Sequence, residues 1–161
     1  MIEATLCFVR WGERVLLIEK HRGLGAGWYN GPGGKVEDGE TPIECVVRET
    51  REEVGLELDP GALERAAELT FLLDGTPHTR CHVFRTDEFD GEPTPSPEAT
   101  PMWVRVDEVP YDRMWEDDRR WLPGILAGRT VRGTIRFTGG EPLDEATFVD
   151  DDLTWDVPLE E

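Results

Sequence analysis

Three glutamates in one predicted helix, Glu49, Glu52 and Glu53, are the residues whose types and spacing most clearly suggest chemistry. Side chains three and four residues apart lie on the same face of a helix, where like charges destabilise it. Hard divalent cations such as Mg²⁺ prefer oxygen ligands and are shared between carboxylates, water and substrate phosphates. The cluster therefore predicts a metal site that handles phosphates. The alternative is a solvated acidic face.

The residues around these glutamates carry the signals that begin and end a helix. Thr41 and Glu44 have the spacing of a capping box, with Pro42 at the first helical position. Gly55 supplies the C-terminal stop. Apolar spacing along the helix predicts a buried stripe made of Ile43, Val47, Thr50 and Val54.

The spacing of this segment resembles the signature of the Nudix family, over residues 34–56. Gly34 is followed after five residues by Glu40, and after seven more by the run Arg48-Glu49-Thr50-Arg51-Glu52-Glu53-Val54-Gly55-Leu56. Only Thr50 departs from the signature, which has an aliphatic residue there. The resemblance implies the Nudix fold, an α/β fold with a mixed β-sheet sandwiched between α-helices. It also implies hydrolysis of a nucleoside diphosphate linked to a further group.

Two further segments are similar to the MutT-type branch of that family that hydrolyses oxidised purine nucleoside triphosphates such as 8-oxo-dGTP and 2-hydroxy-dATP. They are the glycine-rich stretch from His21 to Val36 and the run Met114-Trp115-Glu116-Asp117-Asp118. With the flanking strands, the similarity covers about residues 4–138, most of one domain. Departures at Leu24, at Trp28-Tyr29 and at Glu116 bear on the base preference.

The resemblance implies roles for residues that face the phosphates. It assigns Mg²⁺, or Mn²⁺ in its place, to a ligand set made of Glu49, Glu52, Glu53, Glu98 and the carbonyl group of Gly33. Glu53 or Glu98 would take the proton of the attacking water. Arg48 would orient the carboxylate of Glu52, four residues later, or would form an ordinary pair on the helix surface.

The resemblance also implies a nucleotide-binding set. Lys20 and Lys35 are expected to contact phosphate, and the remaining substrate contacts are expected from Thr5, Gly34, Phe71, Asn30, Trp115, Asp117 and Asp118. An amide offers donors and an acceptor, an indole offers a stacking face, and neighbouring carboxylates can share one proton. A carboxylate pair that can exchange donor and acceptor roles would form hydrogen bonds with both oxidised purines. The alternatives are that Trp115 belongs to the core and that Asp117 or Asp118 only caps the next helix.

The charge balance is extreme, with 35 acidic and 17 basic residues and a formal net charge of −18. Such a surface is typical of a halophilic protein, because molar salt screens the repulsion within it. It disfavours nucleic-acid binding, which depends on basic groups. The composition predicts a soluble, cytoplasmic monomer without a membrane span, and the three cysteines, Cys7, Cys45 and Cys81, are expected to be buried thiols.

The length of 161 residues predicts a single domain, residues 1–161, with an acidic C-terminal tail at about 150–161. A glycine-rich loop is expected over 23–34, a proline-rich loop over 90–101, and a helix over 119–127 in which Pro123 causes a kink or a boundary. Strands are expected over 3–9, 14–19, 69–73, 80–85, 102–106, 131–138 and 146–149.

Two other functions are compatible with the same residues. The family signature does not define the group attached to the diphosphate, so another dNTP, ADP-ribose or a dinucleoside polyphosphate could be the substrate. A Nudix-fold sensor could also bind a nucleotide without cleaving it. The complete glutamate set, with Glu40, favours an enzyme.

Overall fold

The computed structural model describes residues 1–140 and 143–159. In this part of the chain the α-helices are α1 (Pro42–Val54) and α2 (Asp118–Leu126), and the 3₁₀ turns are η1 (Pro60–Ala62), η2 (Tyr111–Arg113) and η3 (Leu143–Glu145). The strands are β1 (Ile2–Trp11), β2 (Arg14–Lys20), β3 (Tyr29–Asn30), β4 (Gly33–Lys35), β5 (Glu57–Leu58), β6 (Glu64–Leu73), β7 (Thr76–Thr86), β8 (Phe89–Asp90), β9 (Ala99–Arg105), β10 (Val131–Thr138) and β11 (Thr147–Trp155).

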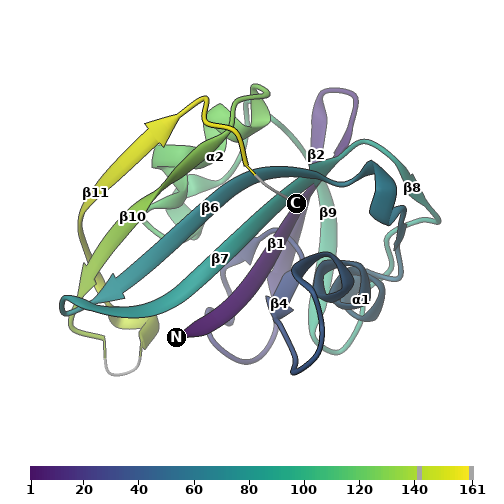
Figure 1. Ribbon diagram of the computed structural model, residues 1–161. Coiled ribbons are helices and arrows are strands. Elements are labelled where there is room, and N and C mark those ends of the chain that lie inside the picture. Colours follow the sequence, from purple (N-terminus) through teal and green to yellow (C-terminus); the bar gives the residue numbers. More distant parts are fainter. Residues whose placement is uncertain (141–142, 160–161) are drawn as a thin grey trace.

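A long mixed sheet organises the molecule (Figure 1). Its strand order is β11-β10-β6-β7-β1-β2-β3, with β4 added to β1 and β9 added to β2. The pairs β1–β7 and β6–β10 are parallel, and the other described pairs are antiparallel. The two short strands β5 and β8 form a separate pair that the sequence did not predict.

The alternation of side chains along β1 separates two cores. Cys7 and Val9 belong to the cluster that packs with α1, whereas Phe8 belongs to the cluster that contains Trp121 of α2. Successive side chains of a strand point to opposite faces of its sheet. The helices therefore cover opposite faces, which confirms the expected mixed sheet between helices.

Helix α1 forms where its sequence signals place it. The Glu44 amide donates to Thr41 Oγ1 at 3.1 Å, and the Thr41 amide donates to Glu44 Oε1 at 2.9 Å, which completes the capping box. Gly55 ends the helix with a left-handed φ of 74°. The buried stripe is shifted from the expected one, because Cys45 and Val46 are fully buried while Ile43 and Val47 are half-buried.

The C-terminal region corrects one expectation. Residues 150–155 are not part of a tail but complete strand β11, which pairs along the whole of β10. Arg136 forms ion pairs with Asp150 and Asp152, and Trp155 packs against the core. Strand formation thus pairs two acidic side chains with Arg136 and partly buries Phe148, Leu153 and Trp155 against the core. Residues 160 and 161 of the expected tail lie outside the described residues.

Several expected elements differ in extent. Strands β6 and β7 are longer than predicted, and β9 begins at Ala99 within the expected proline-rich loop. The glycine-rich loop contains β3 and β4, since its backbone pairs with β2 and β1. Helix α2 continues through Pro123, so this residue does not mark a boundary.

The three cysteines are free and buried, as expected. Among the described residues, no helix combines the length and the apolar composition that a membrane crossing requires.

Raising KCl from tens of millimolar toward about 1 M is expected to raise the melting temperature. The ion pairs on the surface are mostly exposed, and such pairs contribute little, so the unbalanced charge of −18 dominates. The Debye length falls from about 30 Å at 0.01 M to about 3 Å at 1 M, which relieves repulsion between carboxylates. Thermal unfolding followed by circular dichroism measures the effect. A flat or falling melting temperature over this range would contradict the halophilic interpretation.

Candidate active site

One cavity of about 850 Å³ collects most of the residues that the sequence singled out. It is lined by residues of both helices and of the central strands, and it reaches the start of the family signature. Its lining includes Thr5, Lys20, Asn30, Gly33, Gly34, Lys35, Glu49, Glu53, Phe71, Glu98, Trp115, Asp117 and Asp118. Arg48 and Glu52 do not line it. The cavity thus has carboxylates from α1 in one part and a pair of aspartates at the start of α2 in another.

Glu53 is the most deeply placed of the α1 glutamates. It is 5% exposed, and its Oε1 accepts a hydrogen bond from the Gly33 amide at 2.9 Å. Burial raises the pKa of Glu53 to about 7, and the hydrogen bond from Gly33 opposes that rise. Burial also raises the pKa of Glu49, and the neighbouring Glu52 and Glu98 charges add to the rise.

Close packing explains the glycines that precede α1. A Cβ atom on Gly34 would lie 2.5 Å from the carboxyl carbon of Glu49, and one on Gly33 would lie 2.0 Å from the carbonyl oxygen of Thr5. Neither distance is possible for a larger residue without movement of its neighbour. The glycines therefore let the strand β4 backbone approach β1 on one side and the α1 carboxylates on the other.

Arg48 ties α1 to the loop before it. Its Nε and Nη2 donate to the two carboxylate oxygens of Glu40 at 2.7 and 3.0 Å, and its Nη1 donates to Glu49 at 2.9 Å and to Glu52 at 3.3 Å. These hydrogen bonds lower the pKa of Glu40 to about 2. The expected contact with Glu52 is present, but the bidentate pair with Glu40 is the stronger one. Arg48 thus lies outside the cavity and links Glu40, Glu49 and Glu52 by hydrogen bonds.

The oxygen-rich part of the cavity suits a divalent cation. The carboxylates of Glu49 and Glu53 repel each other, and the Glu98 charge acts on both. Among the described residues, no three acidic, histidine or cysteine side chains converge on one point that could hold a metal ion. Mg²⁺ commonly binds one or two carboxylates and completes its shell with water and substrate phosphates. The residues present fit that mode, and the full expected ligand set is not assembled around one point.

The aspartate pair occupies a nearly dry position. Asp117 and Asp118 are 1% and 3% exposed, and Asp117 Oδ2 accepts a hydrogen bond from Trp121 Nε1 at 2.8 Å. Asp117 Oδ1 and Asp118 Oδ2 are buried and accept no hydrogen bond from the described residues while both carboxylates are ionised, whereas a proton on one group would let it hydrogen-bond to the other. Such unpartnered atoms are costly, and both residues line the cavity. Neither side chain caps α2 with a hydrogen bond, which argues against a purely structural role.

Burial raises the pKa of Asp117 to about 6 and, with repulsion from Asp117, raises the pKa of Asp118 well above its usual range. The folded protein therefore binds more protons than the unfolded chain between about pH 4 and the raised pKa values. The free energy of unfolding contributed by this pair falls as the pH rises through that window. At neutral pH the pair destabilises the fold.

Asp118→Asn is therefore expected to increase the free energy of unfolding at pH 8 by about 1–3 kcal/mol, and to change it little at pH 4. Urea unfolding at both values of pH measures the difference. Asp112→Asn, which changes an exposed aspartate six residues earlier, serves as the control and should show no pH-dependent gain. A loss of stability at pH 8 would contradict the assignment of a protonated, destabilising pair.

Aromatic side chains line the cavity together with the aspartate pair. Trp115 meets Phe137 edge to face with ring centroids 6.3 Å apart, and Phe137 lies 6.4 Å from Phe71. Asn30 lines the cavity, and its Oδ1 accepts a hydrogen bond from the Gly31 amide at 2.8 Å. Trp115 is half-buried, so one part of its ring is accessible.

Thr5 forms side-chain contacts within the protein, whereas Lys20 and Lys35 form no ion pairs among the described residues. The Thr5 hydroxyl points toward the Gly34 carbonyl, at 3.3 Å, and toward Cys45 Sγ, so this side chain supports β4. The ion pairs among the described residues are formed by arginines and by His82. Lys20 and Lys35 form no ion pair with the described residues, although the Lys20 charge opposes the rise that burial causes in the pKa of Glu53.

Residues that the sequence did not single out complete the cavity. Trp121 holds Asp117, a contact that the spacing of four residues on one helix could have indicated. Phe137 lies on β10, far from the other site residues in sequence, and no local pattern marks it. His78 and Thr79 of β7 add polar groups to the lining, with His78 Nδ1 2.7 Å from Thr79 Oγ1.

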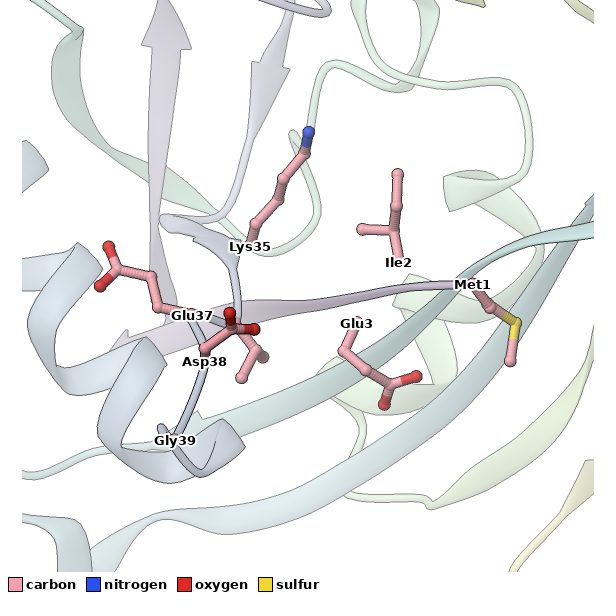
Figure 2. Close-up of a pocket in the computed structure, with 8 residues that line it drawn as sticks. Met1, Ile2, Glu3, Lys35, Glu37, Asp38 and Gly39 are labelled. Atoms are coloured by element: carbon pink, nitrogen blue, oxygen red, sulfur yellow. The ribbon is translucent and has the colours of Figure 1, made fainter.

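A smaller hollow of about 440 Å³ adjoins the cavity and shares Ile2 and Lys35 with it. Figure 2 shows that the Lys35 side chain points away from Glu37 and Asp38, which lie on the loop before α1. The hollow therefore does not hold Lys35 in a local ion pair.

Known proteins resemble this chain across the same segments. The family model described as the NUDIX domain matches residues 2–125. The oxidized purine nucleoside triphosphate hydrolases of Danio rerio and Mus musculus are each 40% identical to the chain, over 88% and 83% of its length and 90% and 85% of theirs. The crystal structure of the mutator MutT protein from Bacillus halodurans superposes with a TM-score of 0.77 at 28% identity, covering 95% of this chain and 97% of that one. The chain therefore belongs to the Nudix family and is a Nudix hydrolase with MutT-type relatives.

Proposed function

We propose that the protein is a Mg²⁺-dependent pyrophosphohydrolase that converts oxidised purine nucleoside triphosphates, such as 8-oxo-dGTP and 2-hydroxy-dATP, into monophosphate and pyrophosphate. Such an activity would remove damaged nucleotides from the pool. The observation that carries the proposal is the single cavity in which the α1 carboxylates and the unpartnered Asp117–Asp118 oxygens occur together. The names of the two relatives at 40% identity support it.

The proposed binding of the triphosphate follows from the chemistry of the Nudix family, whose members generally use divalent metal ions and act on nucleotides. Glu49 and Glu53 would hold Mg²⁺, or Mn²⁺, and Glu52, Glu98 and the Gly33 carbonyl would complete the set once substrate phosphates are bound. The bound cation supplies charge neutralisation of the triphosphate and polarisation of phosphorus. Lys20 and Lys35 would bind the remaining phosphate charge.

The chain itself supplies the proton acceptor. Glu53 is within the cavity, is held by the Gly33 amide and lies beside the carboxylates that face the phosphates. It can accept a proton from the attacking water, as a general base on a rigid helix. Glu98, which also lines the cavity, is the other candidate. Arg48 acts indirectly, because it fixes Glu49 and Glu52 through the pair with Glu40.

The purine base of the substrate would be recognised by hydrogen bonds and by stacking. The unpartnered oxygens of Asp117 and Asp118 can accept from donor groups of a purine, and a carboxyl group that keeps its proton can donate. The raised pKa values of both groups favour a shared proton near neutral pH. A pair that can exchange donor and acceptor suits both 8-oxoguanine and 2-hydroxyadenine. Asn30 and Trp115 would add an amide and a stacking face.

The net charge of −18 disfavours binding to nucleic acids, so free nucleotides are the proposed substrates.

The test is a panel of nucleotides assayed in high KCl with Mg²⁺, with Mn²⁺ and with a chelator. The panel includes the two oxidised purine triphosphates, the ordinary dNTPs, ADP-ribose and a dinucleoside polyphosphate. The proposal predicts monophosphate and pyrophosphate release that requires the metal and is fastest for the oxidised purines. Preference for ADP-ribose or a dinucleoside polyphosphate would assign another Nudix activity. Tight binding without turnover would indicate a sensor.

A further inference from the structure

The loop before β3 is closed at its base by backbone hydrogen bonds. The Lys20 amide donates to the Trp28 carbonyl at 3.0 Å, and the Gly27 amide donates to the Lys20 carbonyl at 2.7 Å. The Trp28 amide in turn donates to the Gly25 carbonyl at 2.9 Å. Trp28 therefore starts from a fixed backbone position beside the end of β2, although its loop is exposed.

From this position the Trp28 ring contacts Trp115 edge to face. The ring centroids are 5.0 Å apart and the planes make an angle of 73°. Gly25 lies against the same indole, since a Cβ on Gly25 would be 3.5 Å from Trp115 Nε1. On another side Trp115 meets Phe137 at 89°. The Trp115 ring is thus held between the glycine-rich loop and strand β10.

Arg113 provides a second link between the same two segments. Its guanidinium lies over the Tyr29 ring, 5.1 Å from the centroid, and its Nη2 donates to the Gly27 carbonyl at 3.4 Å. Arg113 is two residues before Trp115, and Tyr29 follows Trp28. The loop and the Trp115 segment are therefore joined by two neighbouring aromatic contacts.

We propose that Trp28 is a positioning residue for the purine, which acts by fixing the orientation of the Trp115 ring. Trp28 does not line the cavity, whereas Trp115 does, so Trp28 acts through its neighbour. The inference rests on the proposed function, in which Trp115 stacks on the base. An indole held by two edge contacts loses less freedom when a base stacks on it, so binding is tighter. The effect belongs to recognition of the base and not to cleavage.

The test compares Trp28→Ala with a matched control. Trp11 and Trp103 form a similar edge-to-face pair, with centroids 5.5 Å apart at 62°, and Trp11 is exposed and remote from the cavity. Aromatic pairs of this kind contribute enough for a change of about 2- to 12-fold in an equilibrium constant. Trp28→Ala is expected to raise KM for 8-oxo-dGTP by that factor and to leave kcat within about twofold. Trp11→Ala should leave both unchanged, and Trp28→Phe should restore most of the lost affinity.

Two further variants separate this inference from the proposed function. If Trp115→Ala leaves KM for 8-oxo-dGTP at the parent value, Trp115 does not stack on the base, and the proposed recognition of the purine is wrong. If Trp115→Ala raises KM but Trp28→Ala behaves like Trp11→Ala, only the positioning role is overturned. If both raise KM and the double variant is no worse than Trp115→Ala, Trp28 acts through Trp115. Additive effects in the double variant, or a loss in kcat alone, would overturn the proposal.

Discussion

Glu53→Gln is expected to lower kcat by a factor of about 10² or more while leaving the fold intact. The change removes a charge but little volume, and the amide can still accept the hydrogen bond from Gly33. It removes the proposed metal ligand and the proposed proton acceptor together. Because burial opposes the charged form of Glu53, loss of the charge should not reduce the melting temperature. Steady-state rates and melting curves of the variant measure both parts.

Glu57→Gln supplies the matched control. It makes the same chemical change just after α1, at an exposed side chain that pairs with Arg51 and does not line the cavity. It should keep the parent rate. If Glu53→Gln also hydrolysed 8-oxo-dGTP at near the parent rate, the role assigned to Glu53 would be wrong. If only Glu98→Gln caused a large loss of kcat, the role of proton acceptor would be assigned to Glu98.

Asp118→Asn is expected to separate base recognition from chemistry. The amide fixes a donor at a position where the proposed mechanism needs an exchangeable proton. A lost hydrogen bond that leaves a buried polar partner unpaired costs about 1–3 kcal/mol, or roughly 5- to 150-fold in specificity. The value of kcat/KM for 8-oxo-dGTP should fall by such a factor, and the value for a poor substrate such as dTTP should change far less. Asp117→Asn should behave similarly and also weaken the contact with Trp121.

The comparison between substrates gives this prediction its control. In the proposed mechanism the α1 glutamates act on phosphates that every nucleotide shares, whereas the aspartates act on the base. Equal losses for 8-oxo-dGTP and dTTP would therefore assign Asp117 and Asp118 to the fold or to the phosphates. In that case the preference for oxidised purines would lose its main physical support.

Local rules explain why the sequence predicts α1 and its carboxylates well. The capping box of Thr41 and Glu44 and the stop at Gly55 act within a few residues, so they operate whatever the rest of the fold does. Helix geometry then fixes how Glu49 and Glu53 lie relative to each other. The strands were found for a similar reason, because alternation is a local pattern, although their ends depend on partners.

Contacts between distant segments explain what the sequence could not predict. The side of the sheet that the Thr5 hydroxyl faces is set by the register of β1 with β4. The acidic residues after Val149 become strand β11 only because β10 and Arg136 are there to pair with them. Phe137 lies at the cavity because β10 pairs with β6. These features depend on strand pairing between segments that are far apart in the sequence.

Competitive hydrolysis tests the central claim most directly. Equimolar 8-oxo-dGTP and dGTP are mixed with the protein and Mg²⁺ in high KCl, and each monophosphate is followed with time. The account predicts that 8-oxo-dGMP and pyrophosphate appear first, while dGTP is consumed later. Equal consumption of the two nucleotides, or release of orthophosphate in place of pyrophosphate, would contradict it.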